Sequence, residues 1–230
     1  MSLDTRMHKT ILLKILKDIF SDSMIGPILG FKGGTAAYFF HGLSRFSVDL
    51  DFDLLHLEKQ EQVFGRVKKI LESYGTLKQA DQQRFGLFYL LSYDHKIAGA
   101  QNIKIDINLR QFGSRYEIRP YLGISMKVMV PADMFAHKLV AMTERATNRD
   151  VFDVWFFSKN GWPINTSIVE MRAGMPFKDF LKKCIDDLEG RDKDVLATMG
   201  ELLDEKQKVW VKEHLMTDSI FLLKVMAEAL

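Results

Sequence analysis

Hydrophobic and polar positions alternate along the chain with two different periods. Apolar residues recur at helical spacing over residues 7–20, which predicts an amphipathic helix. Gly26 and Pro27 end this pattern, and the apolar residues 28–29 that follow predict a short strand. The pair Gly33–Gly34 then opens a second apolar segment that predicts a helix. The expected order near the N-terminus is therefore strand, glycine turn, helix.

A strict period of two begins further along the chain. In residues 48–54 the apolar positions point to one face of a predicted strand, while Asp49, Asp51 and Asp53 share the other face. Further strands are expected at residues 85–93, 103–110 and 124–130. Together these segments predict a mixed sheet of four or five strands.

The pattern changes after Pro131. Residues 132–146 and 149–158 have helical spacing, and charged amphipathic segments follow from residue 165 onward. We therefore expect an α+β fold, in which a mixed sheet flanked by helices is followed by a helical C-terminal bundle. The expected domains are residues 1–130 and residues 131–230, with the second packed against the first.

Composition narrows the possible classes of protein. The chain has 230 residues, of which 47% are hydrophobic and 27% charged, and this is enough for one full core or two small ones. The formal charge is only +2, so any site for a polyanion must be local. A single cysteine provides neither a disulfide nor a zinc site, and no uncharged apolar run approaches the roughly 18 residues that span a bilayer. We expect a cytoplasmic protein without a signal peptide or membrane span.

The aspartates of the predicted strand are the first candidate site. Aspartate is a poor strand former, and like charges on one strand face repel each other. Asp49 and Asp51 would hold their carboxylates about 6 to 7 Å apart on an extended strand, and Asp106 on a second strand could complete the set. Oxygen ligands of this kind suit Mg²⁺. The alternatives are a solvated edge strand and, for Asp106, the polar face of a half-buried strand.

The glycine pair is the second candidate. Gly33, Gly34 and Thr35 lie at a predicted helix N-terminus, where backbone amides favour phosphate and the Thr35 hydroxyl could donate to it. A glycine pair by itself often forms only a turn. Its combination with Asp49 and Asp51 favours a binding site for a cation-bound triphosphate.

These residues resemble a known family. Gly33–Thr35 followed by residues 45–52 looks like the opening motif of the polymerase-β-type nucleotidyltransferase superfamily, and more narrowly of the AbiEii toxins of type IV toxin–antitoxin and abortive-infection systems. Residues 104–107 are similar to the motif that carries the third carboxylate, and residues 135–141 and 149–153 to the late helical motifs. The sequence departs from the pattern at Thr35, where many members have serine, and at Asp53, an additional carboxylate.

The resemblance implies roles for several residues. Asp49, Asp51 and Asp106 would bind Mg²⁺, and Asp106 would also assist attack by the acceptor hydroxyl. On the late helices, Lys138 would contact the nucleotide phosphates and Asp153 would be needed for activity. The alternatives are a lysine that extends to solvent and an intrahelical pair of Asp153 with the arginine four residues earlier. Arg45 and Ser47 would either orient the loop or reach a phosphate.

The resemblance also implies a function. The nucleotidyltransferase domain would transfer NMP from an NTP to an acceptor, which is expected to be RNA, with the tRNA 3′ end as the leading candidate. The result would be growth inhibition that a cognate antitoxin relieves. Two other interpretations remain open: a small-molecule or protein hydroxyl as the acceptor, and a catalytically silent binding module of the same fold.

Overall fold

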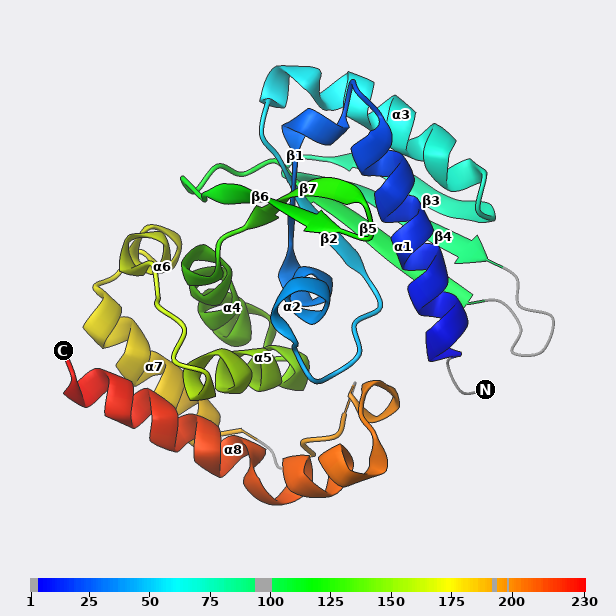
Figure 1. Cartoon of the computed structure of the whole chain (residues 1–230). Helices are drawn as coiled ribbons and strands as arrows, with labels where there is room; N and C mark the ends of the chain where they lie inside the picture. Colours follow the sequence, from blue (N-terminus) through cyan, green and yellow to red (C-terminus); the bar gives the residue numbers. More distant parts are fainter. Residues whose placement is uncertain (1–3, 94–100, 192–193, 198) are drawn as a thin grey trace. The chain divides into compact units, whose positions relative to one another are not determined.

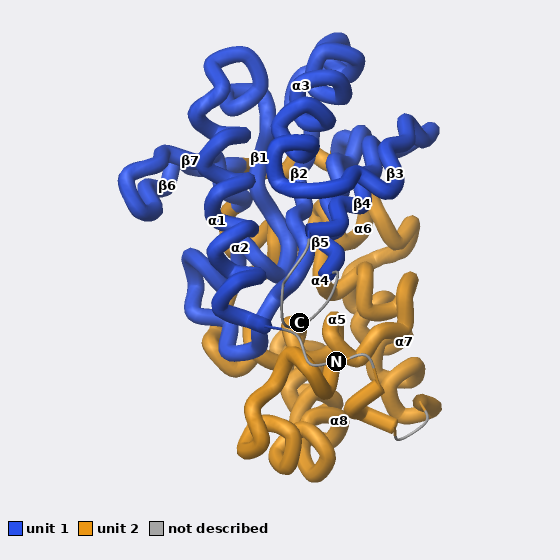
Figure 2. Tube along the Cα trace, turned by 90° about the vertical axis from the view of Figure 1, so that its right-hand side faces the viewer, with its two compact units in different colours: residues 1–111, 116–129 blue, residues 112–115, 130–230 orange. Residues whose placement is uncertain are grey.

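The structure is a computed structural model, and it describes residues 4–93, 101–191, 194–197 and 199–230. The chain divides into two compact units (Figure 2). Unit 1 comprises residues 1–111 and 116–129, and unit 2 comprises residues 112–115 and 130–230. Each unit is considered by itself below.

Unit 1 is built on a mixed seven-stranded sheet with the order β3-β4-β5-β2-β1-β7-β6 (Figure 1). The β1–β7 and β2–β5 pairs are parallel, and the other pairs are antiparallel. This confirms the predicted fold class of a mixed sheet flanked by helices. The strands are β1 (Leu29–Lys32), β2 (Leu50–Leu54), β3 (Thr76–Gln83), β4 (Gly86–Tyr93), β5 (Gln101–Asn108), β6 (Tyr116–Tyr121) and β7 (Ile124–Met129).

The prediction of four or five strands was wrong, because the two edge strands of the sheet have weak sequence signals. Strand β3 is largely polar and mostly accessible to solvent, so it has no apolar alternation to detect. Strand β6 contains Pro120, which is tolerated at a sheet edge but argues against a strand in sequence-based reasoning. Strand β2 also begins at Leu50, so Asp49 lies in the loop immediately before it.

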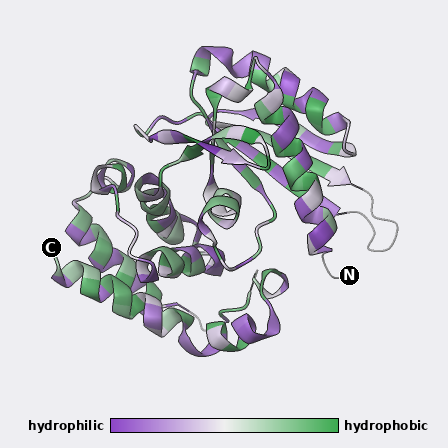
Figure 3. Cartoon of the chain, viewed as in Figure 1, coloured by the Kyte–Doolittle hydropathy of each residue, from purple (hydrophilic) through white to green (hydrophobic). Residues whose placement is uncertain are grey.

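The described residues of unit 1 form three α-helices: α1 (Thr5–Ser21), α2 (Gly33–His41) and α3 (Gln60–Glu72). Helix α1 confirms the predicted amphipathic helix, whereas α3 was not predicted. Hydrophobic and hydrophilic stretches alternate along both α1 and α3 (Figure 3), and the two helices lie beside each other on one side of the sheet (Figure 1). At the end of α1, Phe20 packs against Phe31 of β1 and Phe52 of β2, with ring centroids 6.5 and 6.1 Å away. The side chains that alternate with Phe31 and Phe52 therefore point to the other face of the sheet.

Unit 2 is helical. Its core includes stacked Phe157 and Trp162, whose ring centroids are 4.1 Å apart, and the pair Trp155 and Trp210, at 4.2 Å. In the part of the chain that the structure describes, no helix is long and apolar enough to cross a membrane. The helices are α4 (Pro131–Arg145), α5 (Asn148–Lys159), α6 (Thr166–Ala173), α7 (Phe177–Glu189) and α8 (Glu205–Glu228).

Candidate functional site

The strand register of unit 1 brings two of the predicted carboxylates together. The parallel pairing of β2 with β5 sets Asp51 opposite Asp106, and the antiparallel pairing of β1 with β2 sets Lys32 opposite Asp51. Directly paired residues on neighbouring strands have their side chains on the same face. Lys32, Asp51 and Asp106 therefore form a row across three strands, on the face opposite Phe52.

Two neighbours in this row carry like charges, although Lys32 is paired with Asp51 on its other side. Asp51 is half-buried and Asp106 is exposed, and like charges directly opposite each other destabilise a sheet. Asp49 is half-buried and lies two residues before Asp51, in the loop that leads into the same strand. A bound cation between such carboxylates would remove the repulsion.

The carboxylates fit a hard divalent cation in chemistry, since Mg²⁺ prefers oxygen ligands. Among residues 4–93, 101–191, 194–197 and 199–230, however, no group of three or more His, Cys, Asp or Glu side chains is arranged to hold a metal ion. Mg²⁺ commonly takes only one or two protein carboxylates and completes its octahedron with water and substrate phosphates. Ligation by all three of Asp49, Asp51 and Asp106 stays a prediction.

The glycine turn lies directly against Asp51. Gly33 has a left-handed φ of +80°, and a Cβ atom built on it would lie 2.9 Å from Asp51 Cγ and closer still to Oδ2. A Cβ atom on Gly34 would lie 2.8 Å from a guanidinium nitrogen of Arg45 and 3.0 Å from Ser47 Oγ. Only glycine therefore allows α2 to begin beside these side chains. Lys32, the N-cap residue of α2, makes no capping hydrogen bond with its side chain.

The other residues predicted near the turn are buried. Arg45 is 3% exposed and donates to the carbonyl of Phe46 at 3.0 Å. The Thr35 hydroxyl lies 2.9 Å from Ser47 Oγ and also bonds to the backbone carbonyl of Asp49. Because a carbonyl can only accept, the Thr35 proton points to Asp49, and this bond ties the first turn of α2 to the loop before β2.

Asp53 has partners that the sequence reasoning missed. Its carboxylate is buried and accepts hydrogen bonds from Lys32 Nζ at 2.6 Å, from Asn108 Nδ2 at 2.8 Å and from the Tyr116 hydroxyl. Burial by itself raises the pKa of Asp53, but the charge of Lys32 and these hydrogen bonds outweigh it and hold the pKa below its ordinary value. The Tyr116 ring reaches Asp53 by lying over Gly30, where any Cβ atom would be 2.7 Å from its Cζ.

His8 of α1 supports the loop before Asp49. It is 1% exposed, and burial lowers its pKa more than the hydrogen bond to the Val48 carbonyl raises it. The imidazole is therefore neutral near pH 7. Its Nε2 donates to the Val48 carbonyl at 2.9 Å, so its Nδ1 accepts from the Tyr93 hydroxyl at 2.7 Å. Sequence reasoning had no signal for this histidine, because its partners lie far away along the chain.

In unit 2, the predicted residues Lys138 and Asp153 are in direct contact. Lys138 Nζ lies 2.9 Å from Asp153 Oδ2 and 2.7 Å from Asp150 Oδ1. The Thr147 hydroxyl donates to the other oxygen of Asp150 at 2.7 Å. Burial raises the pKa of Asp150, but the charge of Lys138, together with its hydrogen bond and that of Thr147, lowers the pKa to about 2. The cluster is nearly buried, with the Lys138 side chain 15% exposed and that of Asp153 fully buried.

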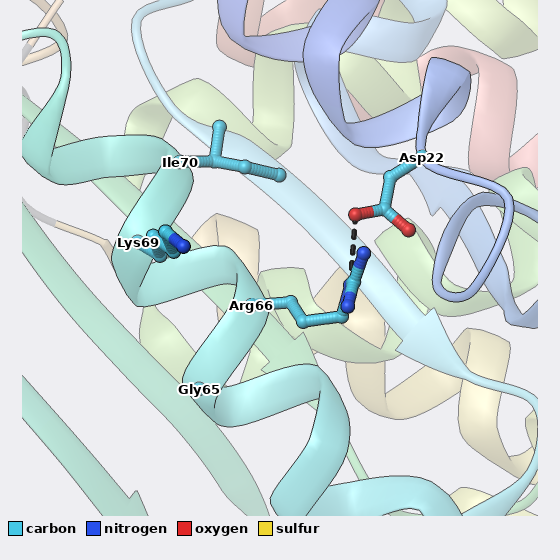
Figure 4. Close-up of a pocket in the computed structure, with 5 residues that line it drawn as sticks. All are labelled: Asp22, Gly65, Arg66, Lys69 and Ile70. Carbon is cyan, nitrogen blue, oxygen red and sulfur yellow. Dashed lines mark hydrogen bonds and ion pairs between the residues drawn. The ribbon is translucent and has the colours of Figure 1, made fainter.

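A pocket of about 330 Å³ lies elsewhere in unit 1 (Figure 4). It is formed by α3 and the end of α1, where Arg66 Nε donates to Asp22 Oδ2 at 2.8 Å. Its lining residues are Asp22, Gly65, Arg66, Lys69 and Ile70. The pocket shares none of these residues with the predicted site.

A comparison with protein families found a match over most of the chain. The family described as "Nucleotidyl transferase AbiEii toxin, Type IV TA system" matches residues 14–203, well over half of the chain. The comparison with curated proteins found no match.

Two solved structures resemble the whole chain. JHP933 from Helicobacter pylori is 22% identical with a TM-score of 0.64, and the match covers 100% of this chain and 94% of that chain. MenT4, a nucleotidyltransferase toxin from Mycobacterium tuberculosis, is 17% identical with a TM-score of 0.58, and the match covers 95% of this chain and 84% of that chain. At these identities the structural likeness supports the fold.

Proposed function

The chain belongs to the AbiEii family of nucleotidyl transferase toxins of type IV toxin–antitoxin systems, and we propose that it transfers NMP from an NTP to an RNA hydroxyl with the help of Mg²⁺. Membership of the family implies an NTP substrate and an antitoxin partner. The observation that carries the proposal is the pairing of Asp51 with Asp106 on adjacent strands, with Gly33 in contact with Asp51.

The proposed reaction is an in-line substitution at the α-phosphorus. The acceptor hydroxyl oxygen forms a bond to the α-phosphorus, the bond from this phosphorus to its bridging oxygen breaks, and pyrophosphate leaves. Asp106 is exposed and therefore accessible to the acceptor, and it takes the proton of the attacking hydroxyl.

Asp49 and Asp51 would hold the divalent cation, with Asp106 as the third ligand. When bound, this cation would neutralise the charge of the triphosphate and align it for attack. The backbone amides of Gly33 and Gly34 would receive the phosphates at the start of α2. Arg45, Ser47 and Thr35 are buried beside the turn, so in this proposal they orient the loop.

Lys138 and Asp153 are proposed to act in the same reaction, on the strength of their positions in the family motif. The contacts within unit 2 support a fixed orientation for Lys138, because two carboxylates hold its ammonium group. Two aspartates around one lysine leave one net negative charge. We therefore expect removal of either carboxylate to alter both the orientation of Lys138 and the local charge.

The RNA acceptor, with the tRNA 3′ end as the leading candidate, belongs to the same proposal. So does a location in the cytoplasm, where NTPs and RNA occur together. Growth inhibition, relieved by the cognate antitoxin, would follow from modification of the RNA.

The experiment incubates the protein with each radiolabelled NTP, Mg²⁺ and total RNA, and separates the RNA, protein and small-molecule fractions. We expect label in the RNA fraction. The Asp51→Ala variant should lose at least about 100-fold in rate, the scale expected when charge stabilisation at the reacting phosphate is removed. Asp18→Asn, at an exposed position of α1 in the same unit, is the matched control and should keep the parent rate.

Label in the protein or small-molecule fraction would show that the acceptor is a protein or a small molecule and not RNA. Absence of transfer to any fraction, with the parent as inactive as Asp51→Ala, would refute the proposed reaction. Thermal unfolding of both variants shows whether a lost rate reflects a lost fold.

A further inference from the structure

The turn between β3 and β4 presents an unusual surface beside the carboxylates. Phe85 is a large apolar side chain that is 50% exposed. The guanidinium carbons of Arg84 and Arg110 lie 4.8 and 5.7 Å from the centre of its ring. Both arginines are themselves exposed. We call Arg84, Phe85 and Arg110 the aromatic–arginine surface.

This surface is fixed to the end of β5. The backbone amide of Leu109 donates to the Phe85 carbonyl at 3.0 Å. Arg110 Nε donates to Asn108 Oδ1 at 3.2 Å, and Asn108 in turn donates to Asp53. The backbone of Phe85 is therefore fixed to the end of β5, and the Arg110 guanidinium is anchored to the buried network that holds Lys32.

The surface is also next to Asp106. Gly86 follows Phe85 directly, and a Cβ atom on Gly86 would lie 3.7 Å from Asp106 Oδ1. Phe88, two residues further, is half-buried and pairs directly with Asp106 across β4 and β5, so the two side chains share one face. An acceptor whose hydroxyl reaches Asp106 would have its neighbouring atoms within reach of this surface.

Aromatic rings and guanidinium planes stack on unpaired nucleobases, and the arginine charges attract the phosphates between them. The chain has a formal charge of only +2, so attraction of a polyanion depends on local groups such as this pair of arginines beside an exposed ring. We propose that the aromatic–arginine surface binds the unpaired terminal nucleotides of a single-stranded RNA end and presents its hydroxyl to Asp106. This inference rests on the proposed function and adds the residues that recognise the acceptor.

The test measures RNA binding directly by fluorescence anisotropy. The probes are a 5′-labelled RNA hairpin with a single-stranded 3′ end of four nucleotides and the same hairpin with a blunt end. The parent protein should bind the first more tightly. Phe85→Ala and Phe85→Leu should lose about ten-fold or more in affinity for the single-stranded end, whereas Phe85→Trp should retain it, because stacking requires a planar ring.

The contribution of Arg84 and Arg110 is tested separately, through the salt dependence of the RNA affinity. Arg84→Gln and Arg110→Gln should each reduce the slope of log affinity against log salt by about 0.7, the contribution of one phosphate contact to a single strand. Arg119→Gln, which removes an arginine of β6 whose side chain is 41% exposed and paired with Glu117, should leave the slope unchanged. Met24→Ala, at a side chain of unit 1 that is 51% exposed, is the matched control for Phe85.

Equal binding of both hairpins by the parent, or equal affinity of parent and Phe85→Ala for the single-stranded end, overturns the inference. So does a Phe85→Ala variant that loses antitoxin binding but keeps RNA binding, since the surface would then recognise a protein. The proposed function is judged separately by label transfer from NTP. A parent that transfers label while Phe85 variants bind normally refutes only this inference.

Discussion

At the scale of single residues, glycines decide how closely the turn at Gly33 and Gly34 can approach the carboxylates. Gly33 adopts a positive φ and also leaves space for the Asp51 carboxylate. These are two independent requirements, backbone conformation and space, and no other glycine in the described part of unit 1 combines both. Gly42 has a φ of +69° with nothing within 4 Å of a built Cβ atom.

The two requirements can be separated by substitution. Gly33→Ala should lower the stability of the fold by about 1–3 kcal/mol through strain and overlap, and should reduce nucleotidyl transfer at least about ten-fold by displacing Asp51. Gly42→Ala adds the positive-φ strain alone and should keep the parent activity. Urea unfolding and label transfer measure the two effects. Parent-like transfer by Gly33→Ala would contradict a catalytic placement of Asp51 against the turn.

At the scale of secondary-structure elements, the edge strand β6 contributes one side chain to the face of the sheet that carries Asp51 and Asp53. Tyr116 extends over Gly30 of β1 and donates to Asp53 of β2. One hydrogen bond thereby joins β6 to β2, two strands far apart along the chain, and the ring of the donor packs over β1. Edge strand β6 thus supports the central strands, although its sequence barely predicts a strand.

A double-mutant cycle tests this contact. Gly30→Ala alone should cost about 1–3 kcal/mol in unfolding free energy, because its Cβ atom overlaps the Tyr116 ring. In a Tyr116→Ala background the same change should cost much less, since the ring is gone, which gives a coupling of about 1 kcal/mol or more. Gly65→Ala in α3, where a Cβ atom meets nothing within 4 Å, should be neutral or stabilising. Additive effects at Gly30 and Tyr116 would show that the ring does not lie on Gly30.

At the scale of the whole molecule, each unit contains a buried cluster of opposite charges. Lys32 and Asp53 form it in unit 1, and Lys138 with Asp150 and Asp153 in unit 2. The removal of one partner leaves an uncompensated buried charge, which usually costs more than the pair contributes. Protonation of the aspartates has the same effect, so the molecule should lose stability in acid.

The direction of this acid effect follows from Asp150. Its pKa is lowered to about 2 in the folded protein from an ordinary value of 3.8. The stabilisation is therefore fully present above the ordinary value and is lost as the pH falls towards 2. The shift corresponds to about 2 kcal/mol. The lowered pKa of Asp53 acts in the same direction.

Chemical unfolding between pH 7 and pH 2 measures this dependence. Asp150→Asn should be less stable than the parent at pH 7 and should show a smaller decrease towards pH 2. Asp179→Asn, at an exposed position of α7, should behave as the parent does. If the parent and Asp150→Asn lost stability in parallel, the Lys138 contact would not be responsible for the acid effect.

Particular residues show which features of the structure can be predicted from the sequence. The alternation around Asp51 predicts which side chains share a face, because a strand has a fixed period of two. The glycine pair predicts the start of α2, because few other residues permit that turn. Asp53 looked like one more member of the acidic face, yet it is the buried partner of Lys32. Three residues donate hydrogen bonds to its carboxylate, and Gly30 leaves space for the ring of one of them, Tyr116. These four residues come from three other strands, and no local pattern in the sequence connects them.

Local periodicity and motifs within short segments were enough to predict the amphipathic first helix, the strand–turn–helix order, the mixed sheet and the family. The tertiary structure alone decided the register that sets Asp51 opposite Asp106, the burial of Asp53 and the contact of Lys138 with two aspartates. It also placed the Phe85 turn beside Asp106. These features depend on hydrogen bonding and packing between segments far apart along the chain, and a period read within one segment contains no information about its neighbour in space.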